Sequence, residues 1–392
     1  MKNFICCLLL AIGFLSFSQD PITSTKMELY GDHIFIHLSV DGSGPLDFIF
    51  DTGDGLPVID LDVANELGLD LNHSSSKTSA QGAIKGALID HNTIELNGIE
   101  LEKDIQLYAT SLRHLEMSIG RNIDGIIGYD LLHHYVVRLD YDRGMFDLFD
   151  QTTYTHDGLG ESFQFKLDNY IPHISGEVTL NDGEILKGEF FLNTGAGTTL
   201  DFNTKYAAKN KIINRTGDHF SYPVAGISSQ ETTHYEGRVK NFGFGTFDFS
   251  DMPIGISTAK HGIQNNKKVA GILGNKVLKK FNITFDYSRE KIHFIRNRNF
   301  AEAFKVNASG VYLQLSEDMS KVLVHRVYDN SPAQGAGINE NDEIVKVNGL
   351  DINEYSLPQL RDILEKTKSS VDLVILQGGE EKEITLDLEE LI

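Results

Sequence analysis

The sequence predicts a mainly β protein: two similar lobes, each a closed β-barrel, followed by a small α+β domain. Two pairs of matching segments recur in the same order, which is typical of two copies of one domain. Short β-branched and aromatic runs separated by glycine and proline favour strands within each copy. A chain of 392 residues is also long for a single core.

The first pair of matching segments consists of an apolar run that ends on a small polar loop. "FIFDTGDG" (48–55) and "FFLNTGAG" (190–197) place Asp51 and Asn193 at equivalent positions, 142 residues apart. The second pair, "DGIIGYDLLHHYVVRLDYDRGMFDLF" and "AGILGNKVLKKFNITFDYSREKIHFI", begins at Asp124 and at Ala270, 146 residues apart. Nearly equal separations indicate a pseudo-symmetric duplication.

The elements expected in each copy are short. "HIFIHLSV" and "DFIFDTG" are expected to be strands because Gly42, Gly44 and Pro45 lie between them. "EFFLNTG" follows the turn sequence of Asn181 to Gly183 and is expected to be a strand as well. Helices are expected at four places: 61–69, 129–135, 202–211 and 275–281.

The last part of the chain has a different pattern. From Ala308 onward, "SGVYLQL", "VLVHRVYDN" and "VDLVILQ" are expected to be strands around the helix "LPQLRDILEKT". The predicted domains are lobe 1 at 19–150, lobe 2 at 151–297 and a domain at 305–392, a common size for a small domain. "FIRNRNFAEAF" (294–304) is the expected joint.

The N-terminus is typical of a cleavable signal peptide over residues 1–18. A short basic start precedes an apolar stretch from Phe4 to Phe17, and small residues precede the expected cleavage site after Ser18. The alternative is a membrane anchor, although the apolar stretch is short for a span. We therefore expect a secreted or periplasmic protein without a membrane span. Both cysteines, Cys6 and Cys7, lie in this segment, so the mature chain would have no disulfide and no thiol nucleophile.

The composition bears on partners and cofactors. The chain has 56 acidic and 35 basic residues, a formal charge of -21, which argues against nucleic acid as a partner. His133 and His134 lack a matching cluster at metal-ligand spacing. "GAGTTL" from Gly195 lacks the third glycine and the strand–helix–strand context of a phosphate-binding glycine loop. We expect no metal and no cofactor.

The repeated loops and the "GIIG" and "GILG" segments that follow them resemble those of pepsin-like and retroviral-like aspartic peptidases. The chain looks most like the bacterial members that carry a PDZ domain. In that family the two loops meet between the lobes, their threonines interlock, and the later glycine segments (here 126–128 and 272–274) back them. The resemblance implies a peptide or protein substrate and a hairpin flap, for which 80–87 is the candidate. It assigns Asp51 and Asn193 as the catalytic pair, with Thr52, Gly53, Asp54, Thr194 and Gly195 in the active-site loops.

The C-terminal segment "SPAQGAGINENDEIVKVNG", from Ser331 to Gly349, resembles a PDZ domain. The resemblance implies binding of peptide C-termini, because PDZ domains add an extended peptide to a sheet edge. It assigns the peptide-binding loop to Gly310, Val311, Tyr312 and Leu313. The alternative is an ordinary α+β domain that only packs against the lobes.

Asn193 leaves the function open between two hypotheses. In the family two close carboxylates share one proton, and an amide can neither take nor give that proton. A missing general acid costs about 10²–10⁴ in rate. One hypothesis is therefore a peptidase with an atypical dyad. The other is a protein that binds peptides in its cleft and PDZ groove and cleaves little or nothing.

Three further positions depart from the family pattern. Gly55 and Gly197 stand where hydroxyl residues usually support the carboxylates, and Asp54 stands where alanine is usual. Asp54 has two interpretations that stay open. It caps the turn, as acids often do, or it faces the cleft, where it supplies a second carboxylate or binds a basic side chain.

Overall fold

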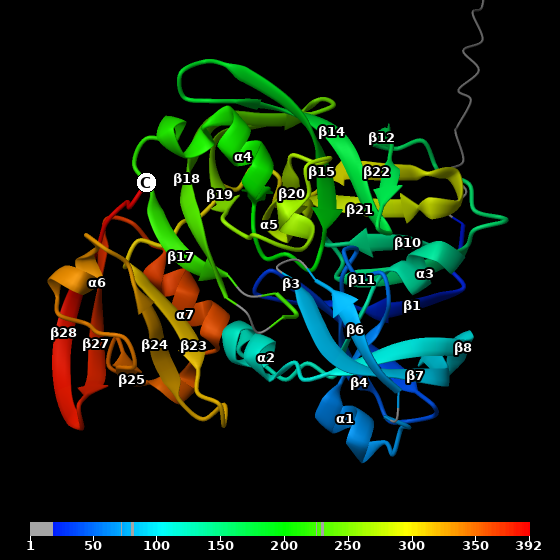
Figure 1. The fold of residues 1–392 in the computed structure, drawn as a ribbon, viewed down its shortest axis with the longest axis horizontal. Helices are drawn as coiled ribbons and strands as arrows, with labels where there is room; N and C mark the ends of the chain where they lie inside the picture. Colours follow the sequence, from blue (N-terminus) through cyan, green and yellow to red (C-terminus); the bar gives the residue numbers. More distant parts are fainter. Residues whose placement is uncertain (1–18, 72, 80–81, 225, 229–230) are drawn as a thin grey trace, which may run out of the picture.

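The computed structural model describes residues 19–71, 73–79, 82–224, 226–228 and 231–392 (Figure 1). Strands dominate these residues, and the helices are short. The expected signal peptide over residues 1–18 lies outside the described residues. The mainly β architecture agrees with the sequence prediction.

Lobe 1 is built on an eight-stranded sheet that closes on itself. An additional pairing between β3 and β7 makes a ring of β3, β4, β9, β5, β8 and β7. In sheet order the strands are β2 (Glu28–Tyr30), β3 (His33–Val40), β4 (Leu46–Phe50), β9 (Gly125–Ile127), β5 (Val58–Asp60), β8 (Ile99–Thr110), β7 (Ala83–Leu96) and β6 (His73–Thr78).

Lobe 2 repeats this arrangement. Its additional pairing, between β14 and β18, closes a barrel of β14, β15, β20, β16, β19 and β18. In sheet order the strands are β13 (Lys166–Asp168), β14 (Ile171–Thr179), β15 (Ile185–Asn193), β20 (Gly271–Gly274), β16 (Leu200–Phe202), β19 (Phe247–Ser257), β18 (Thr232–Phe244) and β17 (Phe220–Val224). The parallel pair β15–β20 corresponds to β4–β9 in lobe 1, as the sequence duplication predicts.

A third sheet joins the two lobes. Its strands come from both halves of the chain, and β10 pairs with β21 across the boundary between them. In sheet order they are β1 (Thr23–Lys26), β11 (Met145–Asp150), β10 (Tyr135–Asp140), β21 (Phe281–Asp286), β22 (Lys291–Arg296) and β12 (Glu161–Gln164). The lobes therefore share one hydrogen-bonded sheet.

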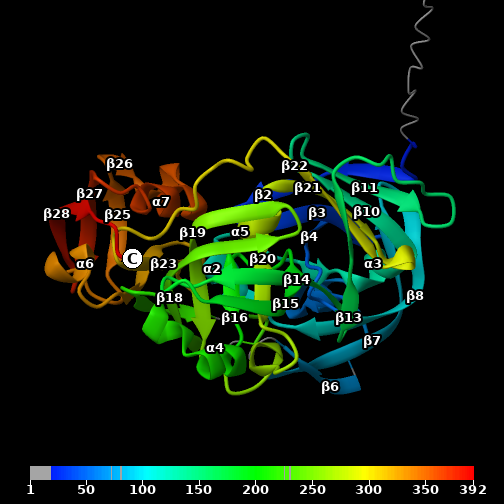
Figure 2. The ribbon, with the colours of Figure 1, turned by 90° about the horizontal axis from the view of Figure 1, so that it is seen from above.

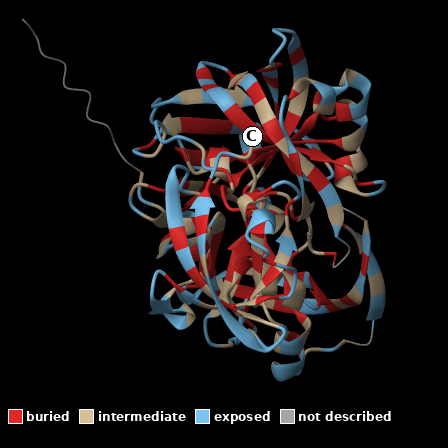
Figure 3. Cartoon of the chain, turned by 90° about the vertical axis from the view of Figure 1, so that its left-hand side faces the viewer, coloured by how far each residue is buried: buried red, intermediate tan, exposed pale blue. Residues whose placement is uncertain are grey.

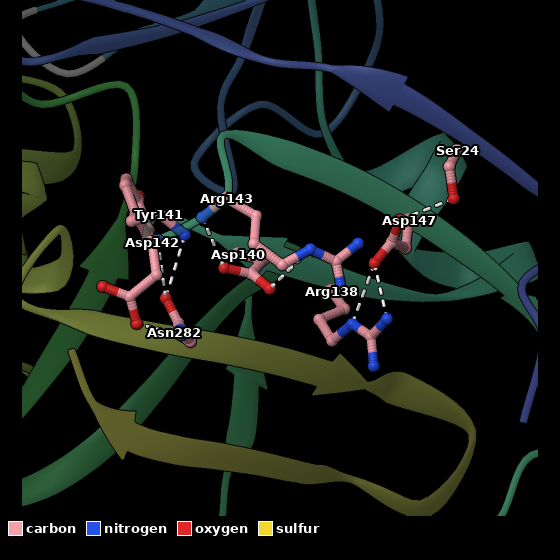
Figure 4. Close-up of polar contacts among 8 residues, drawn as sticks. All are labelled: Ser24, Arg138, Asp140, Tyr141, Asp142, Arg143, Asp147 and Asn282. Carbon is pink, nitrogen blue, oxygen red and sulfur yellow. Dashed lines mark hydrogen bonds and ion pairs between the residues drawn. The ribbon is translucent and has the colours of Figure 1, made fainter. Parts of the chain in front are cut away.

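Polar side chains fasten this shared sheet (Figure 4). Asn282 of β21 accepts from the backbone N–H of Tyr141 at 2.9 Å and donates to the Asp142 carboxylate at 2.9 Å. Arg138 donates two hydrogen bonds, at 2.9 and 2.7 Å, to the buried carboxylate of Asp147. These bonds satisfy groups that would be costly to bury alone.

The helices fall close to the predicted places but are shorter. They are α1 (Leu61–Glu66), α3 (Tyr129–His134), α4 (Thr204–Asn210) and α5 (Asn275–Leu278), with single turns η1 (Ile212–Arg215), η2 (Ile263–Asn265) and η3 (Tyr287–Arg289). The predicted helix over 275–281 ends early because Phe281 begins strand β21. The helix α2 (Arg113–Ile119) was not predicted.

The C-terminal region is a separate sheet with two helices. The edge strand β23 has β24 on one side only, and α7 packs against it. Helix α7 begins at a capping box in which Ser356 and Gln359 bond reciprocally, and it buries Leu357, Leu360 and Leu364. The elements are β23 (Val311–Leu315), β24 (Val322–Val327), α6 (Pro332–Gly335), β25 (Glu343–Val347), β26 (Leu350–Asp351), η4 (Ile352–Glu354), α7 (Leu357–Leu364), β27 (Ser369–Gln377) and β28 (Glu380–Leu388).

Burial follows this layout (Figure 3). One apolar cluster runs through both lobes and the shared sheet, and a second fills the C-terminal region. In lobe 2 the rings of Phe244, Phe247, Phe281 and Phe294 pack mostly edge to face, with centroids 4.7–6.2 Å apart. The lobes therefore share one core, whereas the C-terminal region has its own.

The Asn282 contacts predict a measurable loss of stability. Asn282→Ala should lower the free energy of unfolding by about 1–3 kcal/mol, because it leaves backbone groups of the shared sheet without a partner. Urea denaturation followed by circular dichroism measures this loss. Asn65→Ala, on the exposed face of α1, is the matched control and should change stability by less than about 0.5 kcal/mol. Equal effects of the two substitutions would contradict the prediction.

Candidate functional site

Two loops meet between the lobes at the ends of equivalent strands. Asp51 directly follows β4, and Asn193 is the last residue of β15. Each strand runs parallel to a short glycine-containing strand, β9 or β20. Just after β9, Gly128 has no room for a side chain, since a Cβ there would lie 1.8 Å from the Asp51 carbonyl oxygen. The glycine segments therefore set the path of the loops.

The threonines of the two loops interlock. The backbone N–H of Thr52 donates to Thr194 Oγ1 at 3.0 Å, and the N–H of Thr194 donates to Thr52 Oγ1 at 3.1 Å. Each hydroxyl then donates to a carbonyl of the opposite lobe, Leu192 at 2.7 Å and Phe50 at 2.9 Å. Both threonines are buried, so these four bonds are shielded from water.

This interlock places Asp51 and Asn193 side by side. The position that a Cβ on Gly53 would occupy is 2.3 Å from Asn193 Nδ2 and 3.0 Å from Asp51 Oδ1. A Cβ on Gly195 would lie 2.3 Å from the Asp51 carboxyl carbon. Glycine is required at both positions because the two polar groups fill the space.

Backbone donors orient the two side chains. Gly53 N–H donates to Asp51 Oδ1 at 2.6 Å. Asn193 Oδ1 accepts from Gly195 N–H at 2.7 Å and from Ala196 N–H at 3.0 Å. Because the amide oxygen is held by these donors, the amide NH₂ of Asn193 is turned toward Gly53 and the Asp51 side.

The Asp51 carboxyl group lies in an environment that disfavours its charge. Burial, together with the nearby Asp54 carboxylate, raises the pKa of Asp51 to about 7, although the Gly53 N–H and Lys77 act in the opposite direction. Asp51 is therefore substantially protonated below neutral pH. In that form it can donate a hydrogen bond to a ligand.

Asp54 binds a basic side chain of the same chain. Lys77 Nζ, on strand β6, donates to Asp54 Oδ1 and, at 2.6 Å, to the Leu56 carbonyl. Asp54 is 3% exposed, and its Oδ2 has no hydrogen-bond partner among the described residues. Burial raises the pKa of Asp54 to about 6, against the lowering effect of Lys77. Of the two interpretations of Asp54, the geometry favours a residue that binds a cation.

Lack of space explains why glycine stands at 55 and 197, where the family usually has hydroxyl residues. A Cβ on Gly55 would lie 2.8 Å from the ring of Tyr170, and one on Gly197 would lie 3.2 Å from the ring of His33. Aromatic side chains thus occupy space next to both loops. Any hydroxyl support of the Asp51 carboxyl group from these two positions is lost.

The loops open into a cleft of about 1010 Å³. Its lining comes from both lobes and from the C-terminal region, in which Tyr312 and Arg361 contribute. The hairpin of β6 and β7 supplies Lys77 and Ile84 to the wall. The predicted flap, 80–87, begins outside the described residues at 80–81 and continues into β7.

The proposed peptide-binding loop of the C-terminal region has its own internal partners. Gly310 N–H donates to Asn307 Oδ1 at 2.8 Å, and Val311 N–H donates to Ser309 Oγ at 3.1 Å. Tyr312 and Leu313 lie on the edge strand β23. The loop thus lies at the expected sheet edge, with two of its donors engaged.

The other candidate chemistries gain no support. His133 Nδ1 contacts the Tyr129 hydroxyl at 3.2 Å, and His134 Nδ1 contacts Glu102 at 2.6 Å. Within the described ranges, no group of three or more His, Cys, Asp or Glu side chains is placed to hold a metal ion. The same ranges contain no helix that is both long and apolar enough to cross a membrane.

Sequence reasoning missed Lys77, Tyr170 and the helix α2. Lys77 lies in a polar strand without any motif, so nothing local points to its ion pair with Asp54. A signal for α2 was present, since Leu112, Leu115 and Ile119 follow helical spacing and Gly120 follows as a left-handed cap.

Comparison with known families identifies the class of lobe 1 and of the C-terminal region. Residues 36–131 match the aspartyl protease family, and residues 301–376 match the PDZ domain family. The chain therefore contains an aspartyl protease domain that is followed by a PDZ domain.

Curated relatives share only part of the chain. Proteins from Staphylococcus aureus strains COL, N315 and MW2, each called a probable CtpA-like serine protease, are 28% identical to this chain over 97 residues. That stretch is 24% of this chain, and the chain spans 20% of the length of these relatives.

The raised pKa values predict how stability depends on pH. A carboxyl group whose folded-state pKa lies above its unfolded value destabilises the fold as pH rises through the folded pKa. Asp51→Asn mimics the protonated form. It should leave stability nearly unchanged at pH 4 and increase the free energy of unfolding at pH 8 by a few kcal/mol, at about 1.4 kcal/mol per pKa unit.

Urea denaturation at pH 4, 5.5 and 8 measures this difference. Asp218→Asn, at an exposed position, is the matched control and should show no such trend. A stability gain that is the same at pH 4 and pH 8 would show that Asp51 is not protonated in the fold.

Proposed function

We propose that this protein is a secreted or periplasmic aspartic-type peptidase that binds extended peptides in its cleft and hydrolyses them slowly. The observation that carries the proposal is the interlock of Thr52 and Thr194, which brings the Asp51 carboxyl group beside the Asn193 amide within the cleft. The PDZ domain supports peptides or proteins as substrates. The apolar N-terminal segment supports export.

In the proposed reaction Asp51 acts as the base and then as the acid. Its carboxylate takes one proton from water while the water oxygen attacks the scissile carbonyl carbon. The Asn193 NH₂ donates a hydrogen bond to the carbonyl oxygen as that oxygen gains negative charge. Protonated Asp51 then gives its proton to the leaving nitrogen as the C–N bond breaks, which regenerates the carboxylate and yields an acid and an amine.

This scheme has a defined weakness. Asn193 can stabilise charge on the carbonyl oxygen but cannot transfer a proton to it. The rate should therefore fall short of a two-carboxylate site by about the general-acid factor of 10²–10⁴. The base form of Asp51 increases as pH rises through its pKa of about 7, so the slow hydrolysis should be faster at neutral than at acidic pH.

A second candidate function is peptide binding without hydrolysis. Asn193 itself favours it, because the amide keeps both backbone hydrogen bonds of the loop while removing one titratable group. In that case the cleft and the PDZ domain both serve as binding sites.

Restoring the second carboxylate tests the proposal. Asn193→Asp should raise kcat/KM on a fluorogenic peptide by 10² or more and move the optimum to acidic pH, because two close carboxylates share one proton. The introduced side chain would keep the bonds from Gly195 and Ala196, since a carboxylate oxygen accepts them at least as well as an amide oxygen. Purified variants are compared between pH 3 and pH 8.

Three controls decide between the candidates. Asp51→Asn should abolish activity in the wild-type background, where it leaves no carboxylate in the pair, and Asn214→Asp, at an exposed position of η1, should leave activity unchanged. Loss of wild-type activity in Asp54→Ala, with folding retained, would assign the second acid to Asp54 instead. No hydrolysis by wild type together with a strong gain in Asn193→Asp would favour the binding function.

A further inference from the structure

The PDZ groove is the place to which an extended peptide would add. Strand β23 is the edge of its sheet, paired with β24 on one side and flanked by α7. PDZ domains bind peptides as an added strand at such an edge, with main-chain hydrogen bonds to the peptide. We use "PDZ groove" for β23, α7 and the loop over residues 307–310.

Helix α2 of lobe 1 lies against this groove. Figures 1 and 2 show α2 next to α7 and β23, although it belongs to lobe 1. Gly120, the left-handed cap of α2, has no room for a side chain, because a Cβ there would lie 2.6 Å from Leu357 Cβ on α7. The end of α2 and the start of α7 are therefore in close contact.

Polar bonds tie α2 to both sides of the groove. Arg361 of α7 donates to the Ser118 carbonyl of α2 at 2.5 Å and to the Leu313 carbonyl of β23 at 2.8 Å. The hydroxyls of Ser118 and Tyr312 share a hydrogen bond at 3.1 Å. Lobe 1 is thus bonded to the strand along which a peptide would lie.

In the loop at the end of the groove, backbone N–H groups donate hydrogen bonds to the side chain of Asn307. Asn307 Oδ1 accepts from the N–H groups of Ser309, at 3.0 Å, and of Gly310, at 2.8 Å. A neutral amide oxygen is a weaker acceptor than a carboxylate. A peptide C-terminus that displaced Asn307 would offer these N–H groups a stronger acceptor, while the Asn307 Nδ2 bond to the Val311 carbonyl, at 2.7 Å, would be lost.

The same helix is also a wall of the cleft. Leu115, Ser118 and Ile119 of α2 line the cavity that contains Asp51 and Asn193. A displacement of α2 from the PDZ groove would therefore change the cleft as well.

We infer that α2 holds the PDZ groove closed, and that a peptide with a free C-terminal carboxylate displaces α2 and so controls access to the cleft. The second half of this inference rests on the proposed function of the cleft. Because part of the groove must open before binding, the apparent affinity of the peptide is reduced by the closed fraction of molecules.

The first experiment loosens α2 from the lobe 1 side, so that the groove residues stay unchanged. Ser118→Arg introduces a cation beside Arg361 and a long side chain against Tyr312. The ligand is the tightest peptide from a library of decapeptides with free C-termini, and its Kd is measured by fluorescence anisotropy on the full chain. Ser118→Arg should lower Kd at least tenfold, whereas Ser111→Arg, exposed just before α2, should not. The amidated peptide should bind weakly to every variant.

The second experiment tethers α7 to lobe 1, the lobe that carries α2, at the turn between β2 and β3. A Cβ on Gly31 would lie 3.8 Å from Pro358 Cβ on α7, which is about the mean separation in disulfides, and the reduced variant controls for the strain that a side chain meets at the φ of +60°. Gly31→Cys with Pro358→Cys is made in a chain carrying Cys6→Ser and Cys7→Ser, which leaves no other cysteine. The oxidised form should lose peptide binding, and reduction should restore it.

The third measurement links the groove to the cleft. Saturating PDZ peptide should change the affinity of a hydroxyethylene peptide isostere for the cleft at least threefold in wild type, and not at all in the oxidised double cysteine variant. Equal Kd values for the PDZ peptide in wild type, Ser118→Arg and the oxidised form would overturn the closed groove, as would absence of peptide binding in all of them. If the isostere binds no variant, the proposed function of the cleft and the link to it fail, while the PDZ measurements still decide whether α2 closes the groove.

Discussion

The exchange of hydrogen bonds between Thr52 and Thr194 is the constraint on which the site depends. Neither loop can satisfy its buried groups within its own lobe, because each hydroxyl donates to a carbonyl across the boundary. Buried polar groups without partners would cost several kcal/mol. The two lobes must therefore meet in one register, and the shared sheet with Asn282 holds that register from the other side.

Asn193 keeps the structural contacts that an acid would make at this position, since its amide oxygen accepts hydrogen bonds from Gly195 and Ala196. The amide has no proton to exchange, so the carboxyl group that acts on the charge of Asp51 is that of Asp54. Lys77 supplies the positive charge next to the neighbouring carboxyl groups of Asp51 and Asp54, through its ion pair with Asp54.

The sequence was sufficient wherever a local motif repeats or matches a family. It predicted the mainly β architecture, the paired loops at Asp51 and Asn193, and the PDZ region. It failed where the structure depends on contacts between segments far apart in the chain. The ion pair of Lys77 with Asp54 and the approach of α7 to Gly120 leave no local pattern, because each needs only one residue of a common type. A predicted helix was too long where the next strand begins early, as at Phe281, the first residue of β21.

The ion pair between Lys77 and Asp54 has a consequence for motion. Lys77 lies on the hairpin of β6 and β7, whereas Asp54 lies on the loop beneath it. If the hairpin lifted, Asp54 would lose the cation that lowers its pKa, but it would also gain the solvent whose exclusion raises that pKa most strongly. Water would then replace Lys77 as the group that stabilises the carboxylate. The ion pair is therefore a contact that solvent can take over, and the hairpin can lift without leaving a buried charge behind.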